Sequence, residues 1–92
     1  MVVGLLILDL HFPHARSLKD KRHELQGIKD RLRRHNAAVA ELDHQDVWQR
    51  SRLGIVTLNA DASMVESILD RVLRDVESRL NGVVAAAERR FL

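Results

Sequence analysis

The residue types most capable of chemistry are concentrated in one polar segment, residues 41–52, which reads ELDHQDVWQRSR. It holds three carboxylates, an imidazole, an indole and two guanidinium groups. Consecutive residues of a strand point to opposite faces, so neighbouring carboxylate and imidazole groups do not naturally converge on one ion or proton. A metal site or a catalytic His–carboxylate pair is the weaker interpretation, and its candidates are Asp43, His44 and Asp46, with Asp9 or His11. We expect no metal, no cofactor and no enzymatic activity.

Trp48 is the only tryptophan of the chain and lies within this polar segment. Burying a large aromatic side chain stabilises by ~2–3 kcal/mol, so we expect the indole either to pack on its own domain or to insert into a partner. Tryptophan and arginine are enriched at binding hot spots. We therefore predict a partner contact, with core packing as the alternative. The predicted interaction residues are Asp43, Asp46, Trp48, Arg50 and Arg52.

Positive charge is concentrated in residues 16–35, where eight Lys/Arg and three Asp/Glu give +5, although the whole chain carries only +2. Such asymmetry can steer an anionic partner. Cations around the first turn of a helix, where free N–H groups also point outward, suit phosphate. The predicted RNA-phosphate contacts are Lys19, Lys21, Arg22, Lys29 and Arg33. The alternative is a solvated helix surface, because twelve of the fifteen basic residues are Arg, which can be a compositional bias.

Several classes of protein are excluded by what the sequence lacks. There is no Cys, so disulfides and thiolate metal sites are absent. Gly-rich phosphate loops, GxSxG and HExxH are also absent. The apolar runs contain no aromatic residue, so base stacking on the sheet in the manner of an RRM domain is not expected. No run approaches the ~18 apolar residues of a membrane span. We expect a cytoplasmic protein without a membrane contact.

The hydrophobic period changes along the chain in a definite order. Strand-like runs at residues 2–8, 38–43, 53–59 and 83–87 alternate with helical stripes at 18–32 and 65–80. Strand, helix, strand, strand, helix, strand is the ferredoxin-like βαββαβ order of an α+β protein, here one domain over residues 1–92. We predict helices at about 17–35 and 61–80. The first begins at the N-cap Ser17 and stops at Asn36, and the second starts at Asp61 or Ser63 and ends at Asn81-Gly82. Gly27 is expected to allow close packing of the first helix on the sheet.

The composition of the strands predicts their place in the sheet. The first and third runs are apolar at both parities, which is typical of central strands, whereas residues 38–43 and 85–90 carry charge, as edges do. The predicted two-layer sandwich therefore has an antiparallel sheet of order 4-1-3-2 with both helices on one face. The opposite face is too apolar for water, and a contiguous apolar face normally marks an interface. A homodimer or a small-ligand-binding module using this open face is the alternative function, unless the C-terminus or the polar segment covers it.

With these residues in view, the chain resembles the YlxP-like family of small bacterial domains of unknown function. The resemblance rests on Gly4-Leu5-Leu6, on the stretch SLKDKR at residues 17–22 and on AELDHQDVWQR at residues 40–50. The position of His35 departs from it, because we expect an aromatic residue there. The resemblance implies a ferredoxin-like fold and a gene neighbourhood of translation and ribosome-maturation factors, and it transfers no catalytic residue. We therefore expect a non-enzymatic accessory protein that contacts structured RNA or a ribosomal particle.

Overall fold

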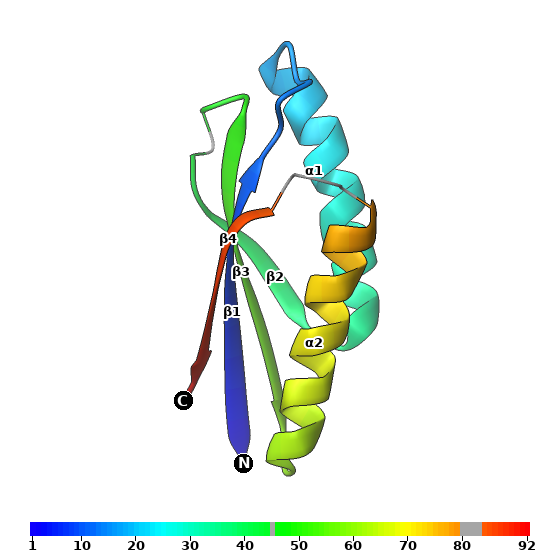
Figure 1. The fold of residues 1–92 in the computed structure, drawn as a ribbon, viewed down its shortest axis with the longest axis vertical. Coiled ribbons are helices and arrows are strands. Elements are labelled where there is room, and N and C mark those ends of the chain that lie inside the picture. The colour runs from blue at the N-terminus through cyan, green and yellow to red at the C-terminus, as the bar shows by residue number, and fades with distance from the viewer. Residues whose placement is uncertain (45, 80–83) are drawn as a thin grey trace.

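The computed structural model describes residues 1–44, 46–79 and 84–92 of the chain. Its four strands form one antiparallel sheet of order β2-β3-β1-β4. The α+β ferredoxin-like fold and the order 4-1-3-2 are thus confirmed, with the central and edge strands as predicted (Figure 1). The elements in chain order are β1 (Val2–His11), α1 (Leu18–Leu32), the 3-10 turn η1 (Arg33–His35), β2 (Ala38–Asp43), β3 (Arg50–Asn59), α2 (Ala62–Arg79) and β4 (Val84–Phe91).

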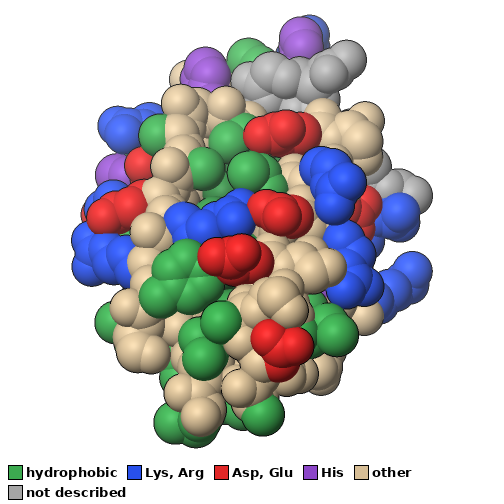
Figure 2. Space-filling model, turned by 60° about the horizontal axis from the view of Figure 1, so that its bottom comes forward, with side chains coloured by type: hydrophobic (Ala, Val, Ile, Leu, Met, Phe, Trp, Pro, Cys, Tyr) green, Lys and Arg blue, Asp and Glu red, His purple; other side chains and the backbone are tan. Residues whose placement is uncertain are grey.

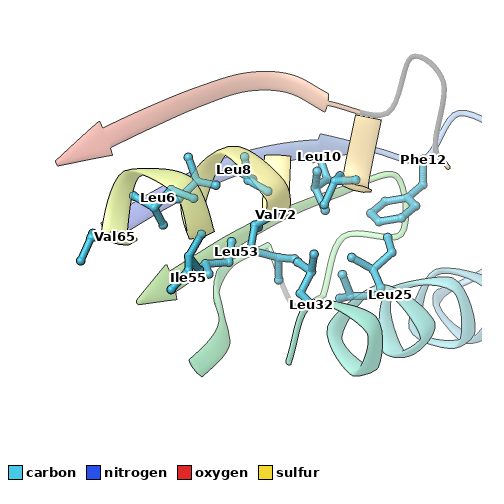
Figure 3. Close-up of a cluster of buried hydrophobic side chains, with 14 of the residues drawn as sticks. Leu6, Leu8, Leu10, Phe12, Leu25, Leu32, Leu53, Ile55, Val65 and Val72 are labelled. Carbon is cyan, nitrogen blue, oxygen red and sulfur yellow. The ribbon is translucent and has the colours of Figure 1, made fainter. Parts of the chain in front are cut away.

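Both helices lie on one face of the sheet, and the core fills the space between the two layers (Figure 1). In β1 every second residue from Gly4 to Leu10 is buried, while the residues between them are only partly covered. Figure 3 shows how leucines of β1 and β3 meet side chains of the two helices. The described core is aliphatic except for Phe12, as the composition predicts.

The first helix begins and ends with the residues that the sequence indicates. Ser17 is the N-cap, and its Oγ accepts a hydrogen bond from the Asp20 N–H at 3.1 Å. The Asp20 carboxylate in turn accepts from the Arg16 N–H at 3.1 Å, so two free N–H groups at this end are satisfied. After η1 the chain turns away at Asn36, which adopts the left-handed conformation with φ 62°. Asparagine tolerates this conformation, which explains the stop.

The second helix begins after Asp61, whose carboxylate accepts from the Ser63 N–H at 3.0 Å. The predicted end at Asn81-Gly82 lies outside the described residues. α2 approaches β1 closely at Gly4, where an added Cβ would lie 2.4 Å from Val65 Cγ1. Gly27 has the opposite environment, because nothing lies within 4 Å of the position of its Cβ. The expected packing role of Gly27 is therefore wrong, because the residue is exposed on α1.

Three strands are longer than the apolar runs that indicate them. β1 continues to His11 rather than stopping at residue 8, β3 begins at Arg50 rather than at residue 53, and β4 continues to Phe91 rather than stopping at 87. These strand ends contain charged residues, so the apolar runs are shorter than the strands. The charged residues nevertheless pair across the sheet in register, Asp9 with Arg52 and Leu5 with Arg90. Among the described residues, no helix is long and apolar enough to cross a membrane.

Candidate nucleic-acid interface

Lys21 is the most deeply buried charged residue that the structure describes, with 0% of its surface exposed. Its Nζ donates to three backbone carbonyls, those of His44 at 2.7 Å, Val47 at 2.6 Å and Arg50 at 3.1 Å. The Glu41 carboxylate lies 3.3 Å from the same ammonium. All three N–H donors of the ammonium are therefore used inside the protein. The predicted contact between Lys21 and RNA phosphate is wrong, because the side chain points into the fold.

The buried ammonium joins two stretches that are far apart in the sequence. Lys21 belongs to the SLKDKR stretch and its four partners to the AELDHQDVWQR stretch. Glu41 is itself held by the Ser51 hydroxyl, which donates to its carboxylate at 2.6 Å. The first turns of α1 and the connection between β2 and β3 are thus one structural unit at the upper end of Figure 1.

Four of the predicted phosphate contacts remain on the surface, three of them on α1 and Arg33 at the start of η1. Lys19, Arg22 and Arg33 are exposed and Lys29 is partly exposed. At about 100° per residue these four side chains fall within an arc of roughly 80°, and they extend over about 21 Å of the helix axis. This set, Lys19, Arg22, Lys29 and Arg33, is called the basic flank below. The buried side of α1, which contains Leu25, points in a different direction.

The basic flank is largely free of internal neutralisation. Arg33 Nη1 lies 3.1 Å from the Asp30 carboxylate, in an exposed pair. In the part of the chain that the structure describes, no carboxylate lies within ion-pair distance of Lys19, Arg22 or Lys29. The face in Figure 2 shows acidic and basic side chains next to each other, with hydrophobic ones between them. Opposite charges at such spacing largely cancel, so attraction of an anion depends on cations without a carboxylate partner.

Four of the five predicted interaction residues of the segment 43–52 are exposed. Trp48 is 45% exposed, and Asp43, Asp46 and Arg50 are also exposed. Arg52 is partly covered on the open side of the sheet, and its Nε lies 3.3 Å from the Asp9 carboxylate without the alignment of a hydrogen bond. The indole therefore lies at the surface rather than in the core.

The metal and catalytic alternatives have no geometric support in the segment 43–46. His44 adopts a left-handed conformation with φ 65°, and its Nε2 lies 4.0 Å from the Asp43 carboxylate. Within residues 1–44, 46–79 and 84–92, no group of three or more His, Cys, Asp and Glu side chains is placed to hold a metal ion.

A histidine–carboxylate pair does exist elsewhere, between two residues that the sequence pattern does not connect. His35 Nε2 lies 2.8 Å from one Asp75 oxygen, and Arg31 Nε donates to the other at 2.6 Å. The cluster joins the end of α1 to α2 beside an open groove of about 240 Å³ between the helices, which Gly27 also lines. Burial of Asp75 raises its pKa, but the hydrogen bonds from Arg31 and His35 outweigh burial, so the pKa of this carboxyl is lowered from 3.8. His35 occupies the position where an aromatic residue was expected. Its contact with Asp75 links η1 to α2.

The comparisons with known proteins agree with the fold and name a family. The family described as "Protein of unknown function (DUF503)" matches residues 3–89. The chain therefore belongs to the DUF503 family. The uncharacterized protein YlxP of Bacillus subtilis (strain 168) is 37% identical over 65 residues, covering 70% of this chain and 71% of that protein. The resemblance to YlxP-like proteins is thus confirmed, and the DUF503 family is one of unknown function.

Solved structures show the architecture without adding a function. The de novo designed protein LFR1 1, which has a ferredoxin fold, is 14% identical with a TM-score of 0.54, covering all of this chain and 83% of that one. SnoaB, a cofactor-independent oxygenase from Streptomyces nogalater, is 12% identical with a TM-score of 0.57, covering 99% and 90%. At such identities these likenesses establish the fold of the DUF503 chain alone.

Proposed function

We propose that this DUF503 protein is a non-enzymatic cytoplasmic protein that binds structured RNA, of the kind found in ribosomal particles, through the basic flank. The observation that carries the proposal is the row of cations on one side of α1, three of which have no carboxylate partner in the described residues. A rigid helix holds these charges over about 21 Å, which is several phosphates of an RNA strand. Each phosphate contact releases counterions and so makes the affinity depend on salt.

The experiment is a titration of a labelled ribosomal RNA hairpin at several salt concentrations. The test variant reverses three charges, Lys19→Glu, Arg22→Glu and Lys29→Glu. We expect affinity at 50 mM salt to fall at least tenfold and the slope of log affinity against log salt to become shallower by about 2–3, because three phosphate contacts are removed. The control reverses two other charges, those of Arg71 and Arg74, which are exposed on α2, and should leave both quantities nearly unchanged.

The RNA proposal would be refuted by either of two results. One is absence of binding to hairpin RNA at low salt. The other is an equal loss of affinity in the α1 and α2 variants, which would show that the affinity depends on the overall charge of the protein and not on the basic flank. Co-sedimentation of the native protein with ribosomal particles then identifies the particle.

A second candidate function is self-association through the open face of the sheet, and a specific observation favours it. Leu42, Val56 and Leu58 are 50%, 38% and 57% exposed on this side, next to Leu5 and Ile7, which are only partly covered. The Leu42 side chain covers Gly54 there, since a Cβ at Gly54 would meet Leu42 Cδ1 at 2.9 Å. Contiguous apolar surface of this kind is removed from water most simply by a second copy of the same chain.

The dimer can be tested independently of RNA. Sedimentation at micromolar concentrations should show a dimer that becomes a monomer in Val56→Arg. Met64→Arg introduces the same charge at an exposed position of α2 and should leave the dimer intact. A wild-type protein that stays monomeric throughout would contradict this second function without affecting the first.

A further inference from the structure

Trp48 is an exposed aromatic side chain on a fixed backbone. Lys21 Nζ binds the carbonyl immediately before it, at Val47, and the carbonyl two residues after it, at Arg50. The Gln49 carbonyl accepts from the Phe12 N–H at 2.8 Å, which ties the same stretch to the end of β1. The side chain of Trp48 is nevertheless exposed, with 45% of the surface of the residue accessible to water. A segment whose backbone is already fixed loses less conformational freedom when a ligand binds, so this arrangement is pre-organised for a contact.

The same buried ammonium ties the backbone around Trp48 to the first turns of α1, from which two cations of the basic flank also project. Lys21 lies between Lys19 and Arg22 in the first turns of α1, and its Nζ reaches the backbone on both sides of Trp48. Figure 1 shows the start of α1 and the connection between β2 and β3 at the same end of the molecule. The aromatic side chain and two unpartnered cations therefore lie at the same end of the molecule, although they are 26 to 29 residues apart in the sequence. Lys19 and Arg22 project about 160° and 100° around α1 from Lys21, so one RNA must extend around the first turns of α1 to contact both the cations and the indole.

We propose that Trp48 stacks on an unpaired base of an RNA whose phosphates are held by Lys19 and Arg22. Stacking on aromatic side chains, combined with cations along the backbone, is how proteins bind single-stranded nucleic acid and the unpaired bases of RNA. Asp43 and Asp46 of the same segment repel phosphates, so the segment contributes the aromatic contact and α1 contributes the charge. The inference rests on the proposed RNA function and adds to it the class of RNA, one with an exposed unpaired base.

The experiment uses the intrinsic fluorescence of Trp48, which is the only tryptophan of the chain. Two RNA probes are compared, a hairpin with an unpaired loop and a blunt duplex with the same number of phosphates. We expect the hairpin to quench the emission and the duplex to leave it nearly unchanged. Trp48→Ala should weaken hairpin binding about 5- to 150-fold, without changing the salt slope or the affinity for the duplex. Trp48→Phe should retain part of the preference, because a phenyl ring also stacks.

The control variant is Phe91→Ala, which removes an aromatic side chain of similar exposure, 47%, from β4 and should leave hairpin affinity unchanged. Circular dichroism establishes that each variant is folded. The stacking inference would be overturned if the hairpin bound in a salt-dependent way without quenching Trp48, and if wild type and Trp48→Ala had the same hairpin affinity. The proposed RNA function would then still stand. Absence of binding to both probes would overturn both. Loss of self-association in Trp48→Ala with unchanged hairpin affinity would assign the indole to a protein contact and also overturn the inference.

Discussion

Lys21→Met removes the buried ammonium while keeping most of the side-chain volume. Three carbonyl groups lose their donor, and Glu41 loses its cation at 3.3 Å. Removing one partner of a buried ion pair costs about 3–5 kcal/mol, because the other partner stays buried and uncompensated. A domain of this size has a free energy of unfolding of roughly 5–14 kcal/mol, so the variant should lose a large part of it. The lower end of the range applies because Ser51 still donates to Glu41.

The assay is urea unfolding of Lys21→Met, followed by circular dichroism and by Trp48 fluorescence. Lys19→Met is the matched control, since it removes the same charge from an exposed position two residues away and should change stability by less than about 0.5 kcal/mol. Adding Glu41→Gln to Lys21→Met should recover part of the loss, because the uncompensated carboxylate is then neutral. A loss below about 1 kcal/mol in Lys21→Met, or equal losses in the two methionine variants, would refute the structural role of this lysine.

Three further changes test other features of the fold. Asp75→Asn should cost about 1–3 kcal/mol near neutral pH, because its bond to Arg31 is charge-assisted. The pKa of Asp75 is lowered in the folded protein, so the contribution of this carboxylate to the free energy of unfolding is present above about pH 4 and is lost as the pH falls further. In unfolding titrations, the difference in free energy of unfolding between wild type and Asp75→Asn should therefore shrink below about pH 4. Gly27→Ala should raise the free energy of unfolding by about 0.5–1 kcal/mol, because an added Cβ meets nothing within 4 Å. Gly4→Ala should lower it by at least 1 kcal/mol, because the same methyl group would lie 2.4 Å from Val65 Cγ1; thermal melts that reverse the order of these two glycine variants would contradict the packing described for them.

The amino-acid pattern is sufficient to predict the order of the elements, the centre and edges of the sheet and the caps of α1. These features follow from periodicity and from short-range hydrogen bonds, as with Ser17 and Asn36, so a window of a few residues contains the necessary information. It also determined that positive charge is concentrated along the first helix. The same pattern does not predict the strand ends, because charged residues such as Arg50 can pair in a sheet as readily as apolar ones.

Tertiary structure alone decided which of these charges reach the surface. Lys21 shares the helical register of Leu25, Ile28 and Leu32, and this spacing indicates a buried position. The charge of Lys21 indicates an exposed position instead, and only the folded structure shows the partners that allow its burial. Those partners are backbone carbonyl groups 23 to 29 residues further along the chain. Every residue has a backbone carbonyl, so the residue types do not indicate which carbonyl groups will accept these hydrogen bonds. The His35–Asp75 pair is equally non-local, at 40 residues. Long-range polar contacts satisfy buried groups wherever the folded chain brings a donor to an acceptor, so they become visible only when the two layers are assembled.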